Sequence, residues 1–154
     1  MNKHIIESLL QPGDLILTTH ANAELNTTPG RWNHTIIYVG GGECLEATRQ
    51  YSSTVMTMLK DVLDRDLGEL CIMRITSDEV TQNRIVKEAW KRNGLPYRML
   101  HSFTRMRRRG ANCVSLANMA ANKAMGVRYD WNLPDDIYAD KSLELILEDT
   151  NHNN

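Results

Sequence analysis

The feature of this sequence that most constrains its fold is a pair of strand-forming segments joined by three consecutive glycines. Residues 34–39 read His-Thr-Ile-Ile-Tyr-Val, glycines occupy positions 40–42, and residues 43–48 read Glu-Cys-Leu-Glu-Ala-Thr. β-Branched and aromatic side chains favour a pleated strand, and glycine accepts the positive φ angles that a tight turn requires. The sequence therefore predicts an antiparallel hairpin over residues 34–48.

The register of this hairpin decides where its two titratable side chains point. If the glycines alone form the loop, Val39 pairs with Glu43 and Ile36 lies opposite Glu46. His34 and Glu46 are then diagonal neighbours on one face, about 7–8 Å apart at the backbone. A loop one residue longer or shorter would turn Glu46 to the opposite face. The predicted contact between imidazole and carboxylate therefore depends on the register.

A second informative segment runs from residue 112 to residue 126, where small, helix-permissive residues lie between two capping residues. Asn112 is suited to be the N-cap, the residues from Cys113 to Met125 carry an alanine-rich apolar stripe, and Gly126 is suited to end the helix. The sulfur of Cys113 is expected at the helix start, where unpaired amides favour a thiolate. The alternative is a small buried thiol, which is the common state of cysteine.

Other segments predict short elements on either side of this pair. Strands are expected over residues 14–18, 53–59 and 70–75, with a surface loop at 21–31 and a charged connector at 60–68. Helical turns are expected over residues 5–10, from a Thr76–Glu79 capping box to Asn93-Gly94, and from Pro134 to Leu147. Residues 149–154 read as a frayed tail.

Length and charge limit the classes of protein to which the chain can belong. With 154 residues, a net charge of -1 and three cysteines, we expect one domain (residues 1–154) in a reducing, cytoplasmic setting. No apolar run approaches the roughly 18 residues of a membrane span, so we expect no stable membrane span. The balanced charge gives no field that would attract nucleic acid.

The three side chains singled out above form a chemically coherent set. Cys113 supplies a thiolate nucleophile, His34 a general base near neutral pH, and Glu46 a carboxylate that fixes the imidazole tautomer. His20, at the end of the first strand, is a secondary base candidate. In the alternative interpretation, in which these residues have no catalytic role, His34 lies at a strand edge and Glu46 faces solvent.

Metal binding is a competing function for some of these residues. His34, Cys44 and Cys113 are permissible zinc ligands, but no paired Cys-x-x-Cys or His-x-x-x-His motif accompanies them, so we expect no metal and no cofactor. Cys44 and Cys71 lie within strand patterns and are expected in the core.

The basic run from residue 105 to residue 109 is the strongest charged patch. Without interleaved aromatic residues it does not predict nucleic-acid binding. Arg105, Arg107 and Arg108 are instead candidates to clamp a substrate phosphate or carboxylate.

The order of these motifs resembles a known family. The motifs are Pro12-Gly13-Asp14-Leu15-Ile16, the segment from Trp32 to Gly40, Leu45-Glu46-Ala47, Gly94-Leu95-Pro96-Tyr97 and Asn112-Cys113. They look like the circularly permuted NlpC-type papain-like hydrolases, YiiX-like branch, which share their permutation with the lecithin retinol acyltransferase group. In these proteins the histidine strand precedes the cysteine helix. The resemblance extends from about residue 11 to residue 136.

The resemblance implies a fold and an activity. The fold is α+β and permuted papain-like, with an antiparallel sheet or small barrel packed against helices. Cys113 would be the nucleophile, His34 the base and Glu46 the orienting residue. The Cys113 amide would contribute to an oxyanion hole, and Tyr97 would line the site.

The expected activity is hydrolysis of an amide or ester bond through an acyl-enzyme. The substrate would be a peptide, a cell-wall peptide or an acyl lipid. The alternatives are a lipid-directed thioesterase or acyltransferase, and a catalytically inactive binding module on the same fold. The oligomeric state stays open.

Overall fold

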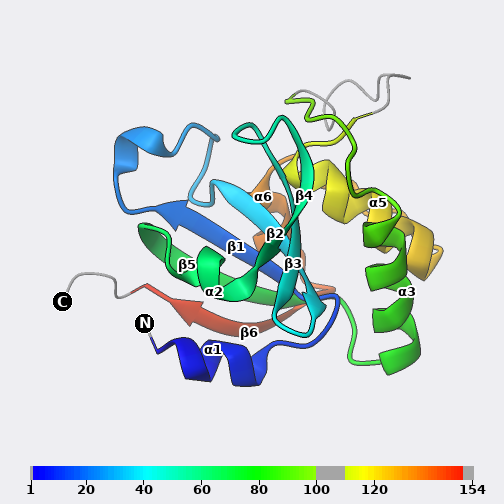
Figure 1. Ribbon diagram of the computed structural model, residues 1–154. Helices are drawn as coiled ribbons and strands as arrows, with labels where there is room; N and C mark the ends of the chain where they lie inside the picture. Colours follow the sequence, from blue (N-terminus) through cyan, green and yellow to red (C-terminus); the bar gives the residue numbers. More distant parts are fainter. Residues whose placement is uncertain (1, 100–109, 151–154) are drawn as a thin grey trace.

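The computed structural model describes residues 2–99 and 110–150, and its central feature is an open, six-stranded antiparallel sheet (Figure 1). The strands are β1 (Leu15–His20), β2 (His34–Gly40), β3 (Glu43–Thr48), β4 (Ser53–Met58), β5 (Leu67–Arg74) and β6 (Glu144–Asp149). Their order across the sheet is β4-β3-β2-β1-β5-β6, so β4 and β6 form the edges. The predicted α+β class is confirmed, and of the two predicted arrangements the antiparallel sheet holds.

Helices cover both faces of this sheet. They are α1 (Lys3–Leu9), α2 (Leu59–Leu63), α3 (Glu79–Trp90), α5 (Cys113–Met125) and α6 (Pro134–Ala139), with a 3-10 helix, η1 (Ala23–Leu25), in the loop after β1. Figure 1 shows α3 and α5 on one side of the molecule and α1 on the other. None of the helices in the described ranges is long and apolar enough to cross a membrane.

Two cores follow from the alternation of side chains along the strands. Odd-numbered residues of the central strands pack with α3 and α5 in one core, which includes Leu15, Ile37, Leu45, Ile85 and Val114. Even-numbered residues pack with α1 and α2 in the other, which includes Ile16, Ile36, Cys44, Ile6 and Val62. Glu46, which is even-numbered, therefore lies on the α1 and α2 side of the sheet, whereas His34 is the first residue of β2 and lies at the end of that strand.

The hairpin of β2 and β3 has the predicted register. Ile37 pairs with Leu45, and Tyr38 pairs with Cys44. The turn itself differs from the prediction, because Gly40 rather than Val39 pairs with Glu43 and the extra residue is absorbed as an irregularity. The glycines at 40, 41 and 42 have φ angles of 96°, 63° and 77°, which L side chains rarely adopt.

Two predicted boundaries in the middle of the chain are wrong. The charged connector contains α2, because Leu59, Val62 and Leu63 have helical spacing and bury one apolar side of a single turn. The N-cap of α3 is Asp78, not Thr76, since the Asp78 side chain accepts the backbone N–H of Thr81.

The predicted final helix is also wrong in its second half. Helix α6 ends at Ala139, and residues 144–149 form β6 against β5, with Leu147 opposite Ile72. Pairing with a strand about 75 residues earlier in the chain outweighs local preference here. Asp149 belongs to this strand, and residues 151–154 of the predicted frayed tail lie outside the described residues.

Candidate active site

Helix α5 places the Cys113 side chain at its first position. Asn112 is the N-cap, and its Oδ1 accepts the backbone N–H of Ser115 at 2.8 Å while the Ser115 hydroxyl accepts the Asn112 N–H at 2.9 Å. Gly126 ends the helix in the left-handed region, with φ of 67°. The predicted helix and both of its caps are confirmed, and the Cys113 sulfur therefore lies in the positive field of a helix N-terminus.

The hairpin brings His34 and Glu46 into direct contact. The Nε2–H group of His34 donates to Oε2 of Glu46 over 2.7 Å. The Glu46 side chain is 0% exposed and that of His34 is 21% exposed. The alternative of a solvent-facing carboxylate is therefore wrong, and the predicted diagonal contact is confirmed.

The Cys113 thiol also interacts with this imidazole. His34 hydrogen-bonds to the thiol, and the backbone N–H groups of Thr35 and Val114 also donate to it. Since Nε2 bonds to Glu46, the imidazole contacts both the carboxylate and the thiol.

These contacts shift the ionisation of both members of the pair. Burial alone would raise the pKa of the Cys113 thiol, but the hydrogen bond and charge of His34, with the two backbone donors, lower it below its usual value. Burial would lower the pKa of His34, but bonding to Cys113 and Glu46 raises it to about 10. The contacts thus favour the charged thiolate–imidazolium pair relative to an isolated thiol and imidazole.

Arg65 completes this arrangement and was not predicted from the sequence. Its guanidinium forms a bidentate ion pair with the Glu46 carboxylate: Nη1 donates to Oε2 at 2.9 Å, and Nη2 donates to Oε1. Burial would raise the pKa of Glu46, but the bonds from Arg65 and His34 hold it well below its usual range. Cys113, His34, Glu46 and Arg65 form a chain of alternating charge, which we call the charge chain.

No local motif marks Arg65. It follows α2 in a stretch where most residues are charged, so one more arginine does not stand out in the sequence. The only available signal is physical: a carboxylate buried on a strand requires a cation or several donors.

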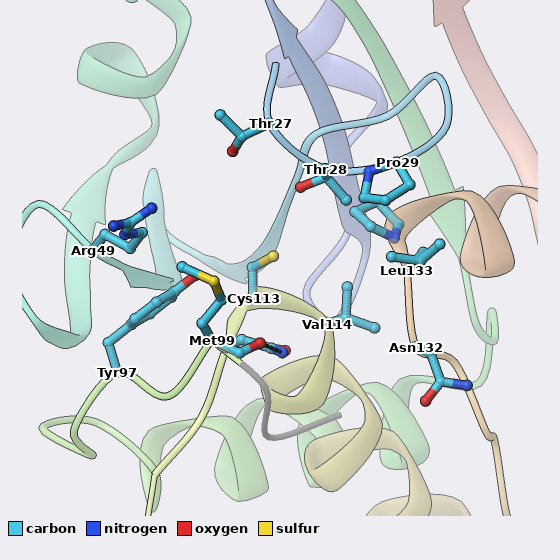
Figure 2. Close-up of a pocket in the computed structure, with 12 residues that line it drawn as sticks. Thr27, Thr28, Pro29, Arg49, Tyr97, Met99, Cys113, Val114, Asn132 and Leu133 are labelled. Atoms are coloured by element: carbon cyan, nitrogen blue, oxygen red, sulfur yellow. Dashed lines mark hydrogen bonds between the residues drawn. The ribbon is translucent and has the colours of Figure 1, made fainter. Parts of the chain in front are cut away.

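A pocket of about 250 Å³ opens beside the thiol (Figure 2). The residues that line it are Thr27, Thr28, Pro29, Arg49, Tyr97, Met99, Asn112, Cys113, Val114, Asn132, Leu133 and Pro134. Figure 2 shows Arg49 and Tyr97 on one side of Cys113, and Val114 and Leu133 on the other. The thiol is therefore accessible from a cavity large enough for a small acyl group.

The loop that forms one wall of the pocket is tied to α6. The Asp135 carboxylate accepts the backbone N–H of Arg31 at 2.9 Å and that of Trp32 at 2.7 Å. Gly30 has a φ of 100°, and a Cβ there would lie 2.2 Å from Asp135 Oδ2, so no larger residue fits. This attachment fixes the wall formed by residues 27–29 relative to the wall formed by residues 132–134.

The other predicted residues divide into three groups. Tyr97 lines the pocket as the resemblance implied. His20 does not join the site, because its Nδ1 accepts the backbone N–H of Asn22 at 3.0 Å. Arg105, Arg107 and Arg108 lie outside the described residues.

Cys44 and Cys71 are buried free thiols, as predicted. Burial, reinforced by the charge of Glu46 for Cys44 and of Glu148 for Cys71, raises the pKa of each to about 12. Of the three cysteines, Cys113 alone has a lowered pKa.

In residues 2–99 and 110–150, no three His, Cys, Asp or Glu side chains are grouped so that they could hold a metal ion. Comparisons with protein-family models, curated proteins and solved structures find no match to this chain.

Proposed function

We propose that this chain is a cysteine hydrolase of the permuted papain-like, NlpC type, which cleaves an amide or ester bond through an acyl-enzyme. The observation that carries the proposal is the contact sequence from the Cys113 sulfur through His34 to the buried Glu46, beside an open pocket. A nucleophile, its base and an orienting carboxylate in this order are the elements of triad catalysis.

Acylation uses the ion pair directly. The Cys113 thiolate attacks the substrate carbonyl carbon, a carbon–sulfur bond forms, and the carbonyl electrons move to oxygen. When the tetrahedral intermediate collapses, the carbon–nitrogen or carbon–oxygen bond breaks and the His34 imidazolium gives its proton to the leaving group. The products of this step are a thioester on Cys113 and a neutral imidazole.

Deacylation returns the proton to His34. A water molecule attacks the thioester carbonyl, its proton passes to the neutral imidazole, and the carbon–sulfur bond breaks to release a carboxylic acid. The thiolate and imidazolium are thereby restored. Glu46 stays ionised throughout, because Arg65 holds its carboxylate while His34 changes charge.

Two features of α5 stabilise the negative charge that develops on the substrate carbonyl oxygen during attack. The Cys113 amide is at the first helical position, where no intrahelical acceptor exists for its N–H. The helix N-terminus adds a partial positive charge at the same point. Together they supply part of an oxyanion hole. The chemistry requires a reduced thiol, which agrees with the reducing, cytoplasmic setting expected from the sequence.

The test is hydrolysis of a panel of peptide amides, cell-wall peptides, acyl lipids and simple aryl esters by wild type, Cys113→Ala and Cys71→Ala. We expect Cys113→Ala to lose turnover, while Cys71→Ala, which removes a thiol from the core, keeps it. Trapping of an acyl adduct on residue 113 by mass spectrometry identifies the intermediate. Full activity of Cys113→Ala on the substrate that wild type hydrolyses would refute the proposal.

The panel also separates the related alternatives. Transfer of the acyl group to an added amine or alcohol in preference to water indicates an acyltransferase, and activity confined to thioesters or lipid esters indicates a lipid-directed enzyme. Binding without turnover, together with an unreactive Cys113, indicates a binding module on the same scaffold.

A further inference from the structure

The two sides of the pocket differ in chemistry, and the nucleophile lies between them. On one side are the apolar side chains of Val114 and Leu133, with Asn132 near them (Figure 2). On the other are Arg49, which follows β3, and Tyr97, which lies between α3 and α5 in the sequence (Figure 2). A substrate whose carbonyl lies at the sulfur therefore extends toward an apolar wall in one direction and a polar wall in the other.

Arg49 is the one permanently charged side chain among the twelve described residues that line the pocket. It is exposed, and no carboxylate of the described residues lies within ion-pair distance of its guanidinium. Arg31, Arg65 and Arg74, by contrast, are each held by a carboxylate. Its planar donors are thus available to a group in the pocket.

Tyr97 adds a neutral donor beside this cation. Burial and the nearby Cys113 raise the pKa of the Tyr97 hydroxyl, and the charge of Arg49 only partly opposes them. The phenol therefore keeps its proton at physiological pH and can donate a hydrogen bond. A cation and a neutral hydroxyl on one wall match the hydrogen-bonding needs of a carboxylate or phosphate oxygen.

We propose that Arg49 selects substrates that carry an anionic group near the scissile carbonyl, on the side opposite the apolar wall. This inference rests on the proposed function and narrows its substrate class. Acyl compounds with a free carboxylate or phosphate close to the cleaved bond are favoured over neutral ones. Arg49 acts as a specificity residue, since it contacts the substrate away from the reacting atoms.

The test compares two reagents that alkylate thiols with the same leaving group and differ in charge: iodoacetate, which is anionic, and iodoacetamide, which is neutral. The rate of modification of Cys113 by each is measured by peptide mass spectrometry at one pH and ionic strength. His34 attracts iodoacetate in every variant, so the informative quantity is the change in the iodoacetate-to-iodoacetamide rate ratio between variants.

We expect Arg49→Ala to lower this ratio about fivefold, as loss of an exposed ion pair implies. Arg49→Glu should lower it further, because attraction becomes repulsion. The matched control is Arg128→Ala, which removes an exposed arginine beyond the other end of α5 and should leave the ratio unchanged. High salt should reduce the difference between wild type and Arg49→Ala.

The outcomes distinguish the two proposals. A reactive Cys113 whose reagent ratio is the same in wild type, Arg49→Ala and Arg49→Glu overturns the role of Arg49 and leaves the hydrolase standing. A Cys113 that reacts in wild type no faster than an unperturbed thiol overturns the hydrolase and, with it, the substrate class.

Discussion

Within residues 2–99 and 110–150, two buried carboxylates each accept two hydrogen bonds from one arginine, and they differ in what else they contact. Asp14, before β1, accepts from Nε and Nη2 of Arg74 at 2.9 and 2.8 Å. Glu46, on β3, is also held by two bonds from one arginine, but these come from Nη1 and Nη2 of Arg65. The two carboxylates are 1% and 0% exposed, so neither is stabilised by water.

The remaining partners of Asp14 belong to the backbone framework. Its Oδ2 accepts the backbone N–H of Gln11 at 2.8 Å, and Arg74 also donates to the Leu9 carbonyl at 2.8 Å. This pair joins the end of α1 and the following turn to β5. All its bonds are used to hold one part of the fold against another.

The remaining partner of Glu46 is His34, the proposed catalytic base. The bond from His34 connects this carboxylate to Cys113 and to the pocket. Arg65 is 35% exposed, whereas Arg74 is 9% exposed. A bidentate arginine–carboxylate pair thus stabilises the fold at Asp14 and, in the proposed function, positions a base at Glu46. The further contact of each carboxylate decides which role the pair has.

The largest expected effect is the loss of turnover when His34, which connects the Glu46–Arg65 pair to Cys113, is removed. His34→Ala should lower turnover by about 10⁴-fold, because the proton donor of acylation and the acceptor of deacylation are both lost. The measurement is kcat/KM on the substrate found in the panel, with circular dichroism as a check on folding. Retention of a tenth or more of wild-type activity would mean that Glu46 is connected to no catalytic base.

The next effect is on stability. Asp14→Asn should lower the free energy of unfolding by about 3 kcal/mol, because it leaves the buried Arg74 charge uncompensated. Glu46→Gln should cost about 1 kcal/mol, since the partly exposed Arg65 can turn to water. Urea denaturation measures both. An equal loss in the two variants would show that the Glu46 pair is as structural as the Asp14 pair.

Glu46→Gln should in turn affect catalysis more than stability. We expect turnover to fall by about 10–100-fold, as for other residues that orient a reacting group. The Glu46 charge helps to raise the pKa of His34 to about 10. Its removal should therefore move the alkaline limit of activity to lower pH, since imidazolium is lost earlier. Asp14→Asn is the control, and its pH profile should match that of wild type.

The smallest effect is expected at the outer end of the charge chain. Arg65→Met should lower turnover by about fivefold, because Glu46 keeps its bond to His34 but loses its fixed orientation. Arg74→Met should change turnover little and stability strongly. Steady-state kinetics and urea denaturation are measured for both variants. A larger loss of turnover in Arg74→Met than in Arg65→Met would show that the Asp14 pair, and not the Glu46 pair, supports catalysis.

Local signals were enough to predict the elements that carry the site. Asn112 and Gly126 are capping residues, so the helix that begins at Cys113 can be predicted within a single segment. The glycines at 40–42 set the hairpin register that brings His34 and Glu46 together.

The features that sequence did not predict depend on distant partners. Strand β6 reads Glu-Leu-Ile-Leu-Glu-Asp, which suits either a helix or a strand until β5 is beside it. Arg65 gains its role only when α2 packs on the face of the sheet that buries Glu46. Neither contact leaves a periodic or spacing signal along the chain.

In the proposed site, His34 lowers the pKa of the Cys113 thiol through direct contact. The measurement is the rate of Cys113 alkylation by iodoacetamide as a function of pH, in wild type and in His34→Ala, with each cysteine followed by mass spectrometry. We expect a wild-type midpoint below that of an ordinary thiol and a shift to higher pH in His34→Ala, while Cys44 and Cys71 stay unreactive. Coincident profiles with an ordinary midpoint would contradict the account.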